Sequence, residues 1–240
     1  MDSAANRWVF FGTGRFFNRQ DATNQLTAAD QESFYGIKEP MTTDPVTHAK
    51  SFTWAAVAPA KLLDVSDAVV YEGGTTVDGV AGVADFGKLK QAVQDDAGWL
   101  LDFATAGERN LGQATILGDI LTFTTYMPSL DACRFEGESY LYALYYGTGT
   151  AYTQSVIGLG TRTVTQQDGT QAHEVLKTRL LGRGVAITPN IHTGREQGSK
   201  AYVQSSTGEI LEIHQLNPSV VKSGKASWEE WWDNGSTPQE

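Results

Sequence analysis

The chain has 240 residues, of which 40% are hydrophobic and 19% charged, and this composition predicts a folded globular protein rather than a disordered one. Its formal net charge of −10 disfavours a nucleic-acid or anionic-lipid partner, because phosphate groups would be repelled. The sequence contains no stretch that is long and apolar enough to span a membrane, and its single cysteine excludes an internal disulfide.

The first half of the chain predicts short strands separated by polar or glycine-rich turns. The predicted strands are residues 7–12, 33–37, 62–66, 67–72 and 99–103. Residues 39–60 hold three of the seven prolines and are expected to be irregular, and residues 73–82 are expected to form turns.

Residues 85–95 form the main predicted helix. Phe86, Leu89 and Val93 recur at helical spacing, and Asp85 can cap the first turn. Gly98 follows the expected end of the helix.

The region 98–149 is the part around which the predicted fold is organised. Residues 113–117 and 120–125 are apolar runs joined by Gly118-Asp119, which predicts a type II′ hairpin because glycine takes the first turn position. Residues 139–145 carry apolar side chains on both faces, which predicts a strand buried on both sides. With residues 150–157 as a fourth strand, we expect an antiparallel sheet stacked between two similar sheets.

The last third of the chain predicts more strands. They are residues 174–181, 184–188, 201–205 and 209–214. Residues 161–169 are expected to be a polar turn, and residues 206–208 turn into the last strand.

Three segments repeat irregularly along the chain, and each is followed by another strand. They are WVFFGTG (8–14), LTFTTYMP (121–128) and AYVQSSTG (201–208). The repeat favours an all-β propeller with an incomplete set of blades and one short helix, and a β-sandwich or barrel is the alternative. We assign residues 3–222 to this partial propeller and residues 223–240 to a polar, tryptophan-containing tail.

No catalytic or metal-binding constellation is visible in the sequence. The zinc, nucleophile-elbow, phosphate-loop and DxDxDG calcium motifs are missing. The histidines are scattered, and we expect surface or strand positions for them: His48, His173, His192 and His214. The carboxylates that cluster in sequence are expected to be solvated: Asp95, Asp96, Asp102 and Glu108.

Other patterns are weaker still. Asp21, Asn24 and Asp30 could ligate a metal, but their spacing is not diagnostic. Gly158-Leu159-Gly160 is only half of a dinucleotide-binding motif and is expected to be a turn.

The candidate interface residues are Trp228, Trp231 and Trp232 in the tail, and Cys133 in a loop. Tryptophan frequently anchors protein interfaces, although the tail could also pack back on its own domain. Cys133 lies beside Arg134, yet without a nearby base an idle or externally paired thiol is the simpler interpretation.

Several motifs resemble the C-terminal propeller of the PilY1 family of bacterial type IV pilus proteins, in the same order. They are RWVFFGTGRFF (7–17), DQESFYGIKE (30–39), GWLLDF…GER (98–109), FTTYMPSLDAC…GESYLYALYYGTG (123–149) and SW (227–228). The resemblance covers nearly the whole chain. It implies a modified, quinoprotein-like propeller that takes part in pilus biogenesis, restraint of pilus retraction, surface adhesion and mechanosensing.

The resemblance also implies an exported protein at the cell surface, with pilins or minor pilins, the remaining blades, and a host or abiotic surface as partners. The family binds calcium through an Asp-rich loop that is missing here, so no cofactor is expected in this chain. The family's N-terminal adhesive region is missing too, which predicts that these residues are part of something longer. Cys133 matches a loop cysteine that is common in the family.

Two functional classes remain open. The first is a non-enzymatic module for pilus biogenesis and adhesion, and the second is a fragment of a quinoprotein-like oxidoreductase. The first is favoured, because the adjacent-cysteine pair of many quinone dehydrogenases is missing and no calcium ligands are evident.

Overall fold

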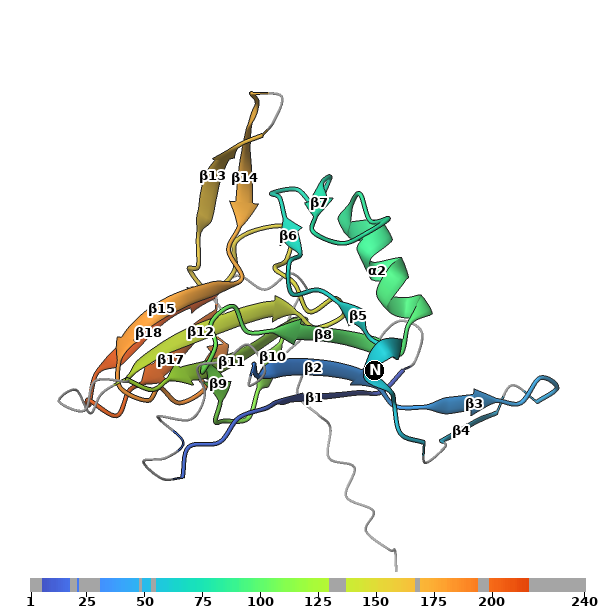
Figure 1. Ribbon diagram of the computed structural model, residues 1–240, viewed down its shortest axis with the longest axis horizontal. Coiled ribbons are helices and arrows are strands. Elements are labelled where there is room, and N and C mark those ends of the chain that lie inside the picture. Colours follow the sequence, from blue (N-terminus) through green and yellow to red (C-terminus); the bar gives the residue numbers. More distant parts are fainter. Residues whose placement is uncertain are drawn as a thin grey trace, which may run out of the picture.

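The computed structural model describes residues 6–17, 21, 31–47, 49–52, 55–129, 137–166, 169–193 and 199–215. In these ranges the chain forms mainly short strands with one α-helix, α2 (Phe86–Asp95), which confirms the predicted mostly-β fold. Figure 1 shows α2 and the projecting hairpin of β13 (Thr161–Thr165) and β14 (Gln171–Val175) on the same side of the sheets.

Three mainly antiparallel sheets make up the body of the protein. The first contains, in spatial order, β1 (Trp8–Gly12), β2 (Ser33–Lys38), β8 (Gly98–Asp102) and β5 (Leu63–Asp64), of which only β5 runs parallel to its neighbour. The second, called here the central sheet, contains β10 (Thr115–Leu117), β11 (Ile120–Met127), β12 (Glu138–Tyr145) and β15 (Thr178–Arg183), and β9 (Arg109–Asn110) pairs with β11. The third contains β16 (Asn190–Thr193), β17 (Ser199–Gln204) and β18 (Ile210–Gln215).

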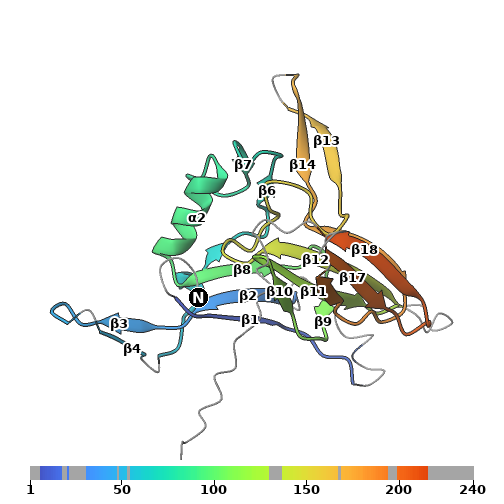
Figure 2. The same ribbon diagram turned by 180° about the vertical axis from the view of Figure 1, so that it is seen from behind.

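Smaller elements connect the sheets. They are the hairpins β3 (Met41–Thr43) with β4 (Lys50–Phe52) and β6 (Val69–Val70) with β7 (Val77–Asp78), and the 3-10 turn η2 (Pro59–Lys61). Seen from behind in Figure 2, the β3–β4 hairpin extends from the end of the first sheet that lies farthest from the third.

The central sheet lies between the other two, as its residue pattern predicts. One face contributes Leu121, Phe123 and Leu144 to a core cluster shared with the first sheet and α2. The opposite face contributes Ile120, Leu141 and Ala143 to a second cluster shared with the third sheet. Successive residues of β12 point to opposite faces, so a run without polar alternation is what a strand between two cores requires.

The irregular repeat corresponds to three antiparallel pairs, β1–β2, β11–β12 and β17–β18. Each pair lies in a different one of the three sheets. Within the described residues, these sheets close into neither a barrel nor a propeller.

The predicted helix is confirmed. Asp85 caps its first turn by accepting a hydrogen bond from the backbone N–H of Lys88 at 2.8 Å, and Phe86, Leu89 and Val93 are its buried side chains. Gly98 does not end the helix but starts β8 with a φ of 142°.

The Gly118-Asp119 turn differs from the type predicted. Both residues have positive φ, 57° and 69°, which is the signature of a type I′ turn and not of type II′. Aspartate tolerates the left-handed conformation, so a Gly-Asp pair is compatible with either turn, and the sequence alone does not decide between them.

The fourth strand of the central sheet is not residues 150–157. Only Thr150 forms an isolated bridge, to Tyr145, and the sheet is completed by β15. Ile157 has a φ of 53°, which interrupts any strand at this point.

Other strand boundaries also differ. Residues 161–165 are strand β13 and not part of a polar turn: they pair with β14, and Arg162 and Glu174 form an ion pair across this hairpin. The predicted strand 174–181 is divided between β14 and β15, and residues 184–188 form only an isolated bridge, at Ala186. The region 39–60 contains β3 and β4, and the turn region 73–82 contains β7.

Candidate functional site

Trp99 brings together three of the motifs on which the PilY1 resemblance rests. Its ring lies between Gly36 of β2 and Gly149 of the YYGTG segment, and a Cβ at either position would come within 2.3 Å of the indole ring. The indole N–H donates to the backbone carbonyl of Tyr146 at 2.8 Å. The glycines of these motifs therefore make room for one buried tryptophan that ties the first sheet to the central one.

Glu108 is a buried carboxylate in a polar cluster beside the central sheet. It is 2% exposed, and its Oε1 accepts hydrogen bonds from Thr125 Oγ1 at 2.5 Å and Tyr142 Oη at 2.8 Å. Burial raises the pKa of Glu108 above its ordinary value, and the two hydroxyl donors oppose that shift. Burial and the nearby carboxylate likewise raise the pKa of Tyr142.

Arg109 anchors the segment that follows β1. Its guanidinium donates to the backbone carbonyls of Gly107 at 3.0 Å, and of Arg15 and Asp21 at 2.8 Å each. Burial lowers the pKa of Arg109, although nearby Glu32 and Asp21 act against that change. The Asp21 carboxylate in turn accepts from Phe17 N and pairs with Arg15, so both of its oxygens are engaged.

The expectation that the four clustered carboxylates are solvated is wrong for Glu108 and holds for the rest. At the end of α2, Asp95 is exposed and Asp96 partly exposed, and the partly exposed Asp102 accepts from Ser33 Oγ at 2.5 Å. Glu108 is buried because β9 pairs with β11 beside it, a contact that its own sequence does not reveal. Both hydrogen bonds of this carboxylate go to side chains of the central sheet, so the cluster fixes the loop before β9.

Lys177 is a partly buried charge, in the turn between β14 and β15. Its ammonium donates to the carbonyls of Ser66 at 2.7 Å and Ala68 at 3.4 Å. Burial lowers the pKa of Lys177 to about 8, and the carboxylates of Asp67 and Glu174 act in the opposite direction.

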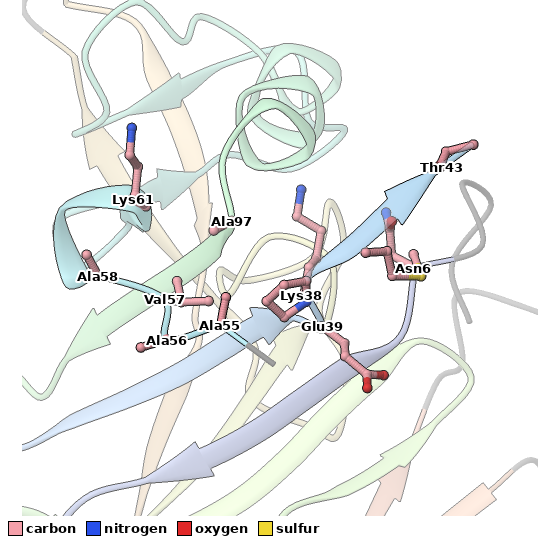
Figure 3. Close-up of a pocket in the computed structure, with 12 residues that line it drawn as sticks. Asn6, Lys38, Glu39, Thr43, Ala55, Ala56, Val57, Ala58, Lys61 and Ala97 are labelled. Atoms are coloured by element: carbon pink, nitrogen blue, oxygen red, sulfur yellow. The ribbon is translucent and has the colours of Figure 1, made fainter. Parts of the chain in front are cut away.

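A cavity of about 710 Å³ lies between the end of β2, β3 and residues 55–58 (Figure 3). The Lys38 ammonium at its wall donates to the carbonyls of Val93 and Gln94, at 3.0 and 2.7 Å, and so stabilises the C-terminus of α2. Figure 3 shows Glu39 pointing away from Lys38 and Lys61, so the charges do not converge on one ligand position.

The outer face of the first sheet is apolar and partly exposed. It consists of alternate residues of three neighbouring strands in register: Val9 and Phe11, Tyr35 and Ile37, and Leu100. Val9 is 54% exposed and Phe11 43%, and the rings of Phe11 and Tyr35 stack at 5.1 Å. This outer face is a candidate interaction surface.

The predicted interface residues Trp228, Trp231, Trp232 and Cys133 all lie outside the described residues, as do Asn24, Asp30 and His48. His173, His192 and His214 lie in strands, as expected. Among the residues that the structure describes, no group of three or more His, Cys, Asp or Glu could hold a metal ion. In that same part of the chain, no helix is long and apolar enough to cross a membrane.

Sequence reasoning missed the buried Glu108 and Arg109, and it missed Lys177. The GER motif gave no clear signal for Glu108 and Arg109, because charged side chains are rarely buried and the sequence alone predicts that they are exposed. Lys177 gives no local signal, because its burial comes from the segment around Ser66, which is far away in sequence.

Comparisons with known proteins agree with the resemblance seen in the motifs. No family model matches the chain. The chain is 24% identical over 236 residues to the "Type IV pilus biogenesis factor PilY1 homolog" of Xylella fastidiosa, in a match that covers 95% of this chain and 17% of that protein. Its fold is similar to that of the Pseudomonas aeruginosa PilY1 C-terminal domain, with a TM-score of 0.53 and 18% identity, covering 86% of this chain and 41% of that one.

The resemblance to the C-terminal region of PilY1 is therefore confirmed in sequence and in fold. The chain spans less than a fifth of the curated relative and less than half of the solved domain.

Proposed function

We propose that this chain is a module of a type IV pilus biogenesis factor of the PilY1 kind, and that it acts by binding other surfaces rather than by catalysis. The observation that carries the proposal is the similarity over 95% of the chain to a protein named as such a factor. The buried states of Glu108 and Arg109 agree with it, because the hydrogen bonds of these groups hold loops in place.

The finer fold assignment belongs to the same proposal. The three sheets are blades of a propeller-type domain that is incomplete in these residues, which occupies residues 3–222 and is followed by the tail 223–240. Support comes from the all-antiparallel order β10-β11-β12-β15 and from the way the central sheet is covered on both faces.

Partners and location follow from the resemblance. The parent protein is exported and associated with pili at the cell surface, where it contacts pilins or minor pilins and contributes to adhesion to a host or abiotic surface. Trp228, Trp231, Trp232 and Cys133 are the candidate contact residues, and no cofactor is required by this chain.

Deletion of the gene tests the biological role. We expect reduced piliation, twitching and surface attachment, restored by the wild-type gene on a plasmid. Normal values for all three in the deletion strain would refute a role in pilus biogenesis.

A dye-reduction assay tests the non-catalytic part of the proposal. The purified chain is incubated with pyrroloquinoline quinone, calcium and a panel of alcohols and sugars. We expect no turnover above a control without quinone, and quinone-dependent turnover would favour the oxidoreductase instead.

A further inference from the structure

The β13–β14 hairpin projects from the stack of three sheets, and its β14 side is anchored to the rest of the protein (Figures 1 and 2). On this side, the Glu72 N–H donates to the carbonyl of His173 at 2.8 Å. Next to it, Tyr71 forms a bridge with Glu174. The opposite side, called here the β13 edge, faces away from β6, β7 and α2. In the part of the chain that the structure describes, no further strand pairs with the β13 edge.

The register of the hairpin shows which backbone groups lie at the β13 edge. Near the tip, the Gln166 N–H donates to the Thr170 carbonyl at 2.8 Å, across the hairpin. Hydrogen-bonded pairs alternate along an antiparallel ladder, so Val164 and Arg162 also turn their N–H and C=O groups towards β14. The remaining residues of β13 therefore turn their N–H and C=O groups outward: Thr161, Thr163 and Thr165.

Strand β13 lacks the features by which exposed edge strands usually avoid further pairing. Its sequence TRTVT contains no lysine, proline or glycine, and it pairs with β14 without a register shift. Its one charge, Arg162, forms an ion pair with Glu174 at 2.6 Å. By contrast, β15 at the end of the central sheet carries Arg179 and Arg183, and its pairing with β12 is interrupted by a register shift. Because threonine and valine favour strands, the β13 edge is well suited to accept another strand.

The sequence of β13 is complementary to a second copy of itself. When two β13 strands pair antiparallel about a two-fold axis at Thr163, this residue faces its own copy and Thr161 faces the partner's Thr165. The facing pairs are then the threonines whose backbone groups point outward, so each pair can exchange two hydrogen bonds. Facing threonines also stabilise neighbouring strands. Arg162 lies opposite the partner's Val164, so no like charges face each other in this pairing.

We propose that the β13 edge is a self-association site, at which two copies of this chain form a two-fold symmetric dimer through one antiparallel strand pair. A surface that is complementary to itself is what a closed two-fold dimer requires. The contact is a single short strand pair, so the dimer is weak and exchanges with the monomer. The hairpin lies outside the stack of sheets, so the pairing is compatible with a propeller-type domain. It does not depend on the proposed role in pilus biogenesis.

Disulfide trapping tests the register of this pairing. In the full 240-residue chain with Cys133→Ser, a single cysteine replaces Thr161, Thr163 or Thr165. The Cα atoms of a hydrogen-bonded antiparallel pair lie about 5.5 Å apart, within the range that a disulfide spans. Each variant is oxidised alone, and an equal mixture of Thr161→Cys and Thr165→Cys is oxidised in parallel. The covalent dimer is measured by non-reducing electrophoresis.

We expect Thr163→Cys to give at least tenfold more covalent dimer than Thr161→Cys or Thr165→Cys alone, because only residue 163 meets its own copy. The mixture of the other two variants should restore dimer formation, with the disulfide joining the two different chains. Equal yields from the three single variants, or no dimer from Thr163→Cys, would overturn the proposal. A mixture that gives no more dimer than its components would also overturn it.

Sedimentation analysis over a range of protein concentrations measures the same association without a cross-link. Thr163→Pro removes an outward-pointing N–H from an exposed position and leaves the hydrogen bonds to β14 in place, so it should weaken dimerisation at least tenfold. Thr163→Val keeps this N–H and is the matched control, which should dimerise like the wild type. A wild type that stays monomeric at the highest concentration, or equal association of the two variants, would refute self-association through the β13 edge.

Discussion

Trp99 shows how single residues hold two sheets together. The Cβ of an alanine at position 36 would lie 2.3 Å from the indole Cε2, while the backbone of β2 is fixed by pairing on both sides. Gly36→Ala should therefore lower the free energy of unfolding by about 1–3 kcal/mol, measured by urea denaturation. Gly112→Ala is the matched control, because its new methyl group would meet only the movable hydroxyl of Thr188, at 3.3 Å. Equal losses in the two variants would contradict the steric explanation.

Glu108 links the buried polar cluster to pH. Because burial raises its pKa above 4.5, its contribution to stability is full below the unfolded pKa and is lost as the pH rises through the higher folded value. Glu108→Gln keeps an oxygen that accepts from Thr125 and Tyr142, so at pH 7 it should be at least as stable as the wild type. Glu108→Leu leaves both buried hydroxyls without their acceptor and should cost about 1–3 kcal/mol. Thermal unfolding between pH 4 and 7 checks both, and a less stable Gln variant at pH 7 would refute this view.

The lowered pKa of Lys177 predicts that stability rises with pH in the alkaline range, the opposite of the effect of Glu108. Its pKa is about 8 when folded and 10.5 ordinarily, so the unfolded chain binds the proton more tightly between these values. Stability should therefore rise with pH from about 8 towards 9.5, by at most about 1.4 kcal/mol per pH unit. Lys177→Met should abolish this rise, while Lys88→Met, at an exposed position on α2, should keep it. Chemical denaturation at pH 7.5, 8.5 and 9.5 measures the free energy of unfolding of each variant. If stability still rises with pH in Lys177→Met, groups other than Lys177 cause the rise.

At the level of elements, substitutions at Asp119 can distinguish the observed type I′ turn from the predicted type II′ turn. A type I′ turn requires positive φ at Asp119, whereas a type II′ turn does not. Asp119→Val should cost about 1–2 kcal/mol, because a β-branched residue is disfavoured in the left-handed region. Asp119→Gly should cost nothing. Urea denaturation of both variants tests the turn type, and a neutral valine would point to type II′.

The elements that sequence reasoning predicted correctly have local causes. Asp85 and the spacing of Phe86, Leu89 and Val93 define α2, and the unbroken apolar run in β12 indicates a strand between two cores. What it missed depends on distant pairing: β15 reaches β12 only after the β13–β14 hairpin, and Glu108 is buried by β11 and Tyr142. The PilY1 resemblance came from motifs whose glycines surround Trp99, which is why short motifs carried so much information about the fold.

At the level of the whole molecule, the central sheet makes the three sheets one cooperative unit. Leu141 and Ala143 of β12 pack on the third sheet, while Tyr142 and Leu144 of the same strand pack on the first. Because both cores share this strand, a substitution that weakens one core should also weaken the other. Domains of this kind unfold as a unit when no element can open without exposing a shared core.

Ile213→Ala tests this cooperativity from the far side of the stack. Ile213 is 6% exposed in β18 and contributes only to the core between the central and third sheets. The substitution should cost about 2–5 kcal/mol. If the stack unfolds as one body, native-state hydrogen exchange will show the same loss of protection at the slowest amides of β8, in the first sheet, as in β17. Val70→Ala, in the core on the other side of the central sheet, is the reciprocal control and should lower the protection of β17 as well as that of β8. A loss confined to β16, β17 and β18 would mean that the third sheet opens alone, and the central strand would then not couple the two cores.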